Sequence, residues 1–86
     1  MITQKQFEFA VNSKIGYLTK YYVSKNSITP AEAYTFLMKS YVIQVLKNKD
    51  SRLFLESIEL LKEALELEFV KGKQTAQKYL ESNIGV

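Results

Sequence analysis

Residues 28–46, ITPAEAYTFLMKSYVIQVL, carry the clearest helix signal in the chain and decide its fold. Thr29 and Glu32 have the spacing of a capping box, in which each side chain accepts a bond from the other residue's backbone N–H. Pro30 falls at the first helical position, where its missing N–H costs nothing. These cues predict a helix over residues 30–47.

The apolar residues of this segment spread over more than one side of the predicted helix. One row at one-turn spacing is Ala33, Leu37, Tyr41 and Val45. An adjacent row that widens this apolar face is Tyr34, Met38, Val42 and Leu46. Phe36 and Ile43 lie on the far side of the helix. A helix this apolar must be covered on several sides. We therefore expect an all-α domain, a small three-helix bundle with a short fourth C-terminal helix, in which residues 30–47 form the central element.

Length and composition limit the function classes. The 86 residues predict a single helical domain, 1–86, near the size at which stability is marginal without oligomerisation. The chain has no cysteine and no histidine, which removes disulfides, thiolate nucleophiles, the usual structural zinc and the usual general base. No Gly-rich phosphate loop is present either. We expect no enzyme activity, no catalytic residues, no cofactor and no bound metal.

No apolar run approaches the roughly 18 residues that a membrane-spanning helix needs. The N-terminal sequence, MITQKQFEF, does not have the pattern of a signal peptide. A cytoplasmic protein without a membrane partner is the expectation.

A first helix is predicted over residues 4–24. Thr3 and Gln6 repeat the capping-box spacing, and Ile2 with Phe7 has the spacing of a hydrophobic staple. The apolar residues that follow have helical spacing and should face the centre: Phe7, Val11, Ile15, Leu18 and Tyr22. Gly16 lies inside this helix at a cost of about 1 kcal/mol relative to Ala, and a close approach of a neighbouring helix is one explanation that we predict for it.

Two further helices are predicted over residues 51–71 and 74–82. Asp50 or Ser51 caps the first, Gly72 ends it in a left-handed conformation, and the second helix places Ala76, Tyr79 and Leu80 on the core. The predicted core is Phe7, Val11, Ile15, Leu18, Leu37, Tyr41, Val45, Phe54, Ile58, Leu61 and Leu65.

The net charge of +3 is unevenly distributed along the chain. Residues 1–49 contain seven lysines and two glutamates, whereas residues 50–68 contain six acidic and two basic residues. Four of the acidic residues form a stripe along the helix predicted over 51–71: Glu56, Glu59, Glu63 and Glu66. A metal site in a bundle needs carboxylates that point into the core, so we interpret the stripe as a solvated face, or as a face that pairs with lysines of residues 4–24 or of a partner subunit.

A strip of basic and aromatic residues runs along one flank of the first predicted helix: Lys14, Tyr17, Lys20, Tyr21 and Lys25. Lysines that counter phosphate charge, interleaved with tyrosines that stack on bases, would form a weak, sequence-independent nucleic-acid site. The alternative is a bundle rim with buried rings, or a contact with a protein partner. The charge pattern argues against helix-turn-helix DNA binding, because the second helix would present the Glu stripe to the phosphates.

More apolar residues remain than one small core can use: Phe36, Met38, Val42, Ile43, Leu53, Leu55, Leu60 and Leu67. A contiguous exposed patch of this kind usually marks an interface. We therefore expect a homodimer, or else a different protein partner that covers the same residues.

Residues 28–37, ITPAEAYTFL, followed by Val42 and Ile43, resemble an uncharacterised family of small all-helical bacterial proteins. In that family an apolar helix, a short polar turn, an EAYxxL-like helix and an acidic segment follow one another, and members are often encoded beside toxin-like enzymes. The resemblance covers about residues 7–66, and it departs at residues 53–55, Leu-Phe-Leu, where the family has a Leu-His-Thr-like step. It implies a protein-binding module, an accessory or antitoxin-like regulatory protein.

Overall fold

The computed structural model describes residues 2–84, which form five α-helices and two short 3₁₀ helices and contain no strand. Their bounds are α1 Gln4–Asn26, α2 Pro30–Met38, α3 Tyr41–Leu46, η1 Lys49–Ser51, η2 Leu53–Leu55, α4 Ile58–Lys71 and α5 Lys73–Ile84. The all-α prediction is confirmed. None of the helices in the described part of the chain is long and apolar enough to cross a membrane.

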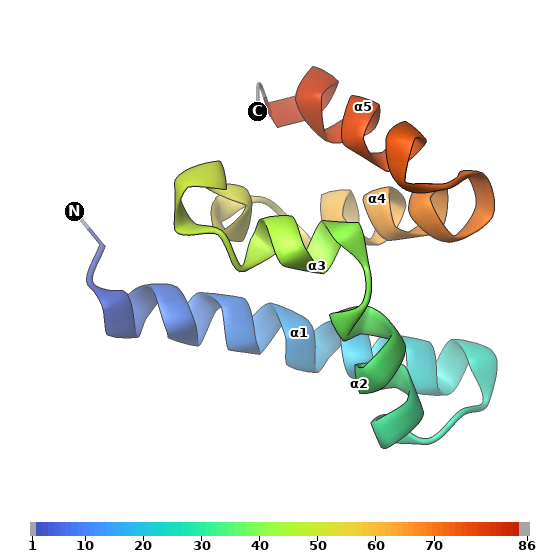
Figure 1. The fold of residues 1–86 in the computed structure, drawn as a ribbon. Helices are drawn as coiled ribbons and strands as arrows, with labels where there is room; N and C mark the ends of the chain where they lie inside the picture. The colour runs from blue at the N-terminus through green and yellow to red at the C-terminus, as the bar shows by residue number, and fades with distance from the viewer. Residues whose placement is uncertain (1, 85–86) are drawn as a thin grey trace.

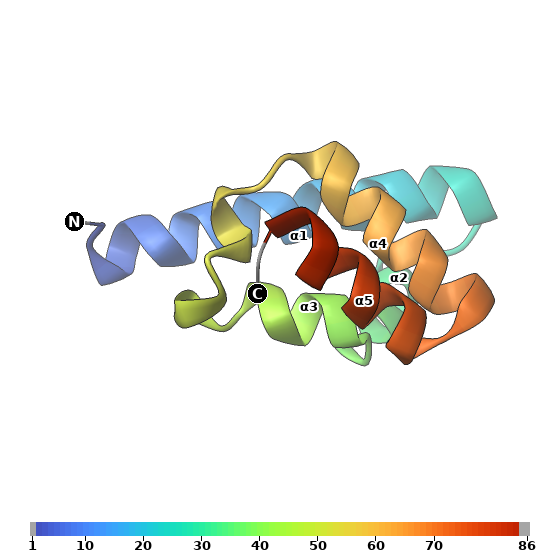
Figure 2. The ribbon, with the colours of Figure 1, turned by 90° about the horizontal axis from the view of Figure 1, so that it is seen from above.

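The helices form two helical hairpins (Figures 1 and 2): α2 turns back steeply across α1, and α5 runs antiparallel to α4. Residues 39–57 connect the two hairpins. α1 packs along α2, and α4 packs along α5. α3, η1 and η2 lie between the two hairpins, and α3 contacts both helices of the second one. The hairpins are thus held together mainly through α3, η2 and side chains that bridge α1 and α4.

α1 and α2 begin where the capping boxes predict. Thr3 Oγ1 accepts a bond from the Gln6 N–H at 3.1 Å, and the Thr3 N–H donates to Gln6 Oε1 at 2.9 Å. Thr29 and Glu32 repeat both bonds at 3.1 and 2.9 Å. The carboxylate of Glu32 accepts the Thr29 N–H, and this bond lowers the pKa of Glu32. Both boxes satisfy N–H groups that have no partner inside the helix.

The prediction of a single helix over residues 30–47 is wrong, because the helix is interrupted at Lys39 and Ser40. Ser40 is buried, and its hydroxyl donates to the Leu37 carbonyl at 2.8 Å and accepts the Ile43 N–H at 3.1 Å. Glu68 of α4 accepts the N–H groups of Tyr41 and Val42 at 2.7 and 3.0 Å. The open amides at the start of α3 therefore have partners, which stabilises the break.

The prediction of an α-helix from residue 51 is wrong as well. Ser57, not Asp50 or Ser51, caps α4, and its hydroxyl accepts the Leu60 N–H at 3.2 Å. Residues 49–55 instead form η1 and η2, separated by Arg52 at φ 60° in the left-handed region. Ser51 fixes this turn, because its hydroxyl accepts the Leu53 N–H at 3.1 Å and donates to the Val45 carbonyl at 2.7 Å.

The two described glycines behave differently from each other. Gly72 separates α4 from α5, as predicted, but its φ of 101° and ψ of 169° lie outside the left-handed helical region and are accessible only to glycine. Gly16 is exposed, and a Cβ at this position would have no atom within 4 Å. The predicted close approach of a neighbouring helix at Gly16 is therefore wrong.

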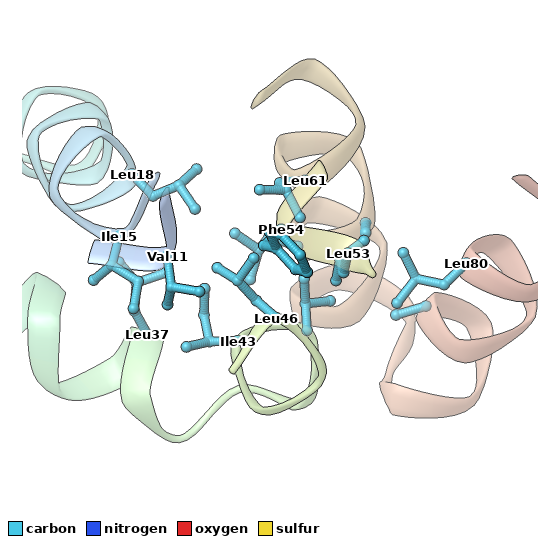
Figure 3. Packing of buried hydrophobic residues seen from close by; sticks show 14 of the residues in the cluster. Val11, Ile15, Leu18, Leu37, Ile43, Leu46, Leu53, Phe54, Leu61 and Leu80 are labelled. Carbon is cyan, nitrogen blue, oxygen red and sulfur yellow. The ribbon is translucent and has the colours of Figure 1, made fainter. Parts of the chain in front are cut away.

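One hydrophobic cluster joins all five helices and η2 (Figure 3). Eight residues of the predicted core are buried in it: Phe7, Val11, Ile15, Leu18, Leu37, Phe54, Leu61 and Leu65. Tyr41, Val45 and Ile58 are only half-buried at its margin. Val42, Ile43 and Leu46 take the central positions instead, because the break at Ser40 changes the face that α3 turns inward.

Candidate functional site

The basic and aromatic strip of α1 lies beside α4, and its tyrosines already contact a cation of the same chain. The ammonium of Lys62 lies 4.5 Å from the ring centroid of Tyr21 and 5.7 Å from that of Tyr17. Tyr21 is half-buried, and Tyr17 is 50% exposed. Cation–π contacts of this length are attractive, so the face of Tyr21 is occupied within the fold.

Lys25, at the end of the strip, forms an ion pair with Glu66 of α4. The Tyr22 hydroxyl donates to the same carboxylate oxygen at 3.4 Å. Burial raises the pKa of Tyr22, and the negative charge of Glu66 raises it further. The hydrogen bond to Glu66 also raises the pKa of Lys25. The prediction that the acidic stripe pairs with lysines of the first helix is thus confirmed at Glu66.

The other strip lysines do not extend this surface into one continuous row. Lys14 is half-buried and Lys20 is exposed. The two are six residues apart, which places them about 120° from each other around the helix axis. Of the other three residues of the acidic stripe, Glu59 and Glu63 are exposed, whereas Glu56 is half-buried and precedes α4. The described residues contain no cluster of acidic side chains that could hold a metal ion.

Beside this ion pair, three aromatic rings from α1, α2 and α4 pack against one another and connect the two hairpins. Tyr22 lies 5.3 Å from Phe36 and 5.8 Å from Phe69, and Phe36 lies 5.2 Å from Phe69, all measured between ring centroids. All three pairs are edge-to-face, the arrangement that aromatic quadrupoles favour. We refer to Tyr22, Lys25, Phe36, Glu66 and Phe69 together as the seam, and its polar and aromatic groups have partners within the chain.

The structure corrects the predicted interface patch. Val42, Ile43 and Leu53 are fully buried, so they do not belong to an exposed surface of the single chain. Phe36, Met38, Leu60 and Leu67 are half-buried against the core or the neighbouring helices. The break at Ser40 and the turn at Arg52 change the helical phase, and this turns the first three residues inward. Of the eight residues, Leu55 alone is strongly exposed, at 65%.

Leu55 borders an open cleft of about 650 Å³ at the opposite end of α1 from the seam. We refer to this cleft and its lining residues as the Leu55 cleft: Ile2, Lys49, Asp50, Arg52, Phe54 and Leu55. Five other large hydrophobic residues are exposed, and none of them lines it: Phe9, Tyr17, Tyr34, Phe69 and Val70.

The floor of the Leu55 cleft is held firmly by the core. Phe54 is 4% exposed, and its ring meets that of Phe7 edge-to-face at 4.9 Å. The Lys49 ammonium lies 5.9 Å from the centroid of the same Phe7 ring. The Leu55 N–H donates to the Arg52 carbonyl at 3.0 Å, which closes η2. Leu55 is therefore exposed on a fixed turn and not on a loose loop.

The rim of the Leu55 cleft carries charges without ionic partners. Among the described residues the only ion pair is that of Lys25 with Glu66, so neither Arg52 nor Asp50 is paired. Arg52 is the only arginine in the sequence. A non-glycine residue at a φ of 60° costs about 1 kcal/mol, and such strain is common where a side chain must be held at a binding site. The cleft thus combines the exposed Leu55 side chain, the buried Phe54 ring and the charges of Arg52 and Asp50.

Sequence patterns alone missed this cleft, although some signals for it were present. Ser40 stands in the middle of an apolar run, and serine favours helix N-caps over helix interiors. Ser57 is followed by Glu59, the usual order at a helix start. Those two signals predict helix starts at α3 and α4, where the structure has them. The left-handed turn at Arg52 has no comparable signal, because arginine has no preference for it.

In comparisons with known proteins, the sequence matches no family model, and no curated protein or solved structure is significantly similar to it.

Proposed function

We propose that this chain is a non-enzymatic protein-binding module and that its contact surface is the Leu55 cleft. The observation that carries the proposal is the 65% exposure of Leu55 on a fixed turn beside an open cleft of about 650 Å³. Covering an exposed leucine side chain is worth about 1.5–3 kcal/mol. The matching partner presents an apolar side chain to Phe54 and Ile2, with charged groups around it.

The remaining features of the chain agree with binding without catalysis. Histidine and cysteine are absent from the sequence. An apolar centre with a charged rim is the usual anatomy of a protein interface. An accessory or antitoxin-like role, which the resemblance of residues 7–66 implies, is one form that such binding takes.

Site-specific photo-cross-linking in cells that produce this chain tests the proposal. A photoreactive amino acid replaces Leu55 in one variant, and Val70 in a matched control. Val70 is 74% exposed and apolar, but it lies on α4 and outside the cleft. We expect protein adducts from position 55 and few from position 70. The absence of any protein adduct at position 55 would overturn the proposed function.

Weak, sequence-independent nucleic-acid binding by the α1 strip is a second candidate. The observation that favours it is Lys62, which adds a cation next to Tyr17 and Tyr21. Glu66 opposes it, because this carboxylate pairs with Lys25. Affinity for a random oligonucleotide should fall steeply with salt, and Lys14→Gln with Lys20→Gln should flatten that slope. An absence of binding at low salt would eliminate this candidate.

A further inference from the structure

The Leu55 cleft contains both halves of a contact within one small surface. Leu55 is a protruding apolar side chain, and the hollow bounded by Ile2 and Phe54 lies directly beside it. In an interface with two-fold symmetry the same patch is used on both subunits, so residue i of one subunit meets residue j of the other and the reverse. A patch with a knob next to a hollow meets this requirement.

The charges of the same cleft are also self-complementary. Arg52 and Asp50 are its two exposed charged residues, have opposite signs and have no ionic partner in the described part of the chain. Lys49, the third charged residue of the lining, is half-buried, and its ammonium lies 5.9 Å from the centroid of the Phe7 ring. A two-fold axis through the cleft brings Arg52 of each subunit opposite Asp50 of the other, which forms two equivalent pairs. A partner with only acidic or only basic groups would leave one of these residues opposite a like charge, which is unfavourable.

We infer that the occupant of the Leu55 cleft is a second copy of this chain, which forms a two-fold dimer. This inference rests on the proposed function, because it names the partner of the same surface. Leu55 of each subunit enters the hollow of the other and packs on Phe54, and the Arg52 and Asp50 pairs fix the register at the rim. Of the eight residues that the sequence predicts for the interface, only Leu55 lines this cleft. The inferred interface is therefore centred on η1 and η2.

The seam surface is a less suitable site for self-association. Its single charged pair, Lys25 with Glu66, is already formed within the chain. Phe36 and Phe69 already contact each other and Tyr22. A second copy placed there would gain apolar area from Val70 and Phe69 but no new charge pairing.

Charge-swapped variants test the dimer by sedimentation equilibrium across micromolar concentrations. Asp50→Arg makes both rim positions basic, and Arg52→Asp makes both acidic, so each variant meets a like charge twice in its own dimer. We expect each variant alone to dissociate at least about tenfold more readily than the unmodified chain. An equimolar mixture of the two should restore association, because positions 50 and 52 are then basic in one subunit and acidic in the other.

A third variant separates a specific dimer from simple attraction between oppositely charged proteins. Leu55→Gln, added to both charge variants, should abolish the association of the mixture, whereas Val70→Gln should leave it unchanged. Circular dichroism checks that each variant remains helical.

The outcomes distinguish this inference from the proposed function. A single 10.0 kDa species of the unmodified chain at all concentrations would overturn the dimer. If cross-linking at position 55 still captured a different protein, the proposed function would stand without it. A dimer that the charge and Leu55 variants leave intact would also overturn the inference.

Discussion

The two ends of α1 contrast in how their polar and apolar groups are used. At the seam, Glu66 binds both Lys25 and Tyr22, and the rings of Tyr22, Phe36 and Phe69 contact one another. At the Leu55 cleft, Arg52 and Asp50 have no ionic partner among the described residues, and Leu55 is 65% exposed. Both ends carry similar residue types. Phe69 of the seam is 42% exposed, but the charged groups of the seam are paired, whereas those of the cleft are not. This difference is the basis of our proposal that the cleft is the binding surface.

The largest expected difference between the two ends is in stability. Tyr22 is 1% exposed, and Tyr22→Ala should lower the free energy of unfolding by about 3–5 kcal/mol through loss of packing. Leu55→Ala should change it by less than about 0.5 kcal/mol in the monomer. Urea unfolding at low protein concentration measures both. Equal losses for the two variants would remove the contrast.

A second test concerns Glu68, which connects α4 to the start of α3 through two backbone amides. Hydrogen bonds to a charged group contribute about 1.5–3 kcal/mol, and Glu68→Ala leaves the N–H groups of Tyr41 and Val42 without this partner. We expect a loss in that range. Glu81→Ala, on the exposed side of α5, should cost less than about 0.5 kcal/mol. A Glu68→Ala protein as stable as the Glu81→Ala control would show that α3 does not need the cap.

The two glycines provide a smaller test with opposite signs. At Gly72, beside the seam end of α4, a φ of 101° strains any other residue, so Gly72→Ala should destabilise by more than about 1 kcal/mol. Gly16 has free space around it in α1, so Gly16→Ala should stabilise by about 0.5–1 kcal/mol. Thermal unfolding measures both shifts. If Gly16→Ala weakened the proposed dimer without destabilising the monomer, α1 would belong to its interface.

A further expected effect is the dependence of stability on alkaline pH. Burial and Glu66 raise the pKa of Tyr22, so the folded chain holds the phenol proton more tightly than the unfolded chain does. The resulting stability is complete below the unfolded pKa of about 10 and is lost as the pH rises above it. Tyr22→Phe should flatten this decline in urea midpoints measured above pH 10. An unchanged slope would show that Tyr22 does not titrate differently in the folded state.

Sequence patterns predicted the parts of the fold that depend on local chemistry. The capping boxes at Thr3 and Thr29 fixed two helix starts, and the helical spacing identified the buried side of α1. Gly72 marked the turn between α4 and α5.

The errors in residues 39–57 have two physical origins. The break before α3 depends on Glu68, which is 27 residues from Tyr41 in the sequence and becomes a cap only in the folded chain. Residues 49–55 follow hydrogen bonds of Ser51 and the unusual backbone of Arg52, so their helical phase differs from that of α4. The sequence predicts Leu55 as an interface residue. Its neighbours in the cleft belong to η1 and η2, which the helical spacing of apolar residues does not predict.

The most direct test of the contrast between the two ends is a dilution series followed by nuclear magnetic resonance. Methyl and amide signals are recorded from micromolar to millimolar concentrations of the unmodified chain. We predict that the signals of Ile2, Arg52 and Leu55 shift with concentration, whereas those of Phe36 and Val70 do not. Shifts confined to the seam, or no shift at the Leu55 cleft at any concentration, would contradict the assignment of binding to this end of the molecule.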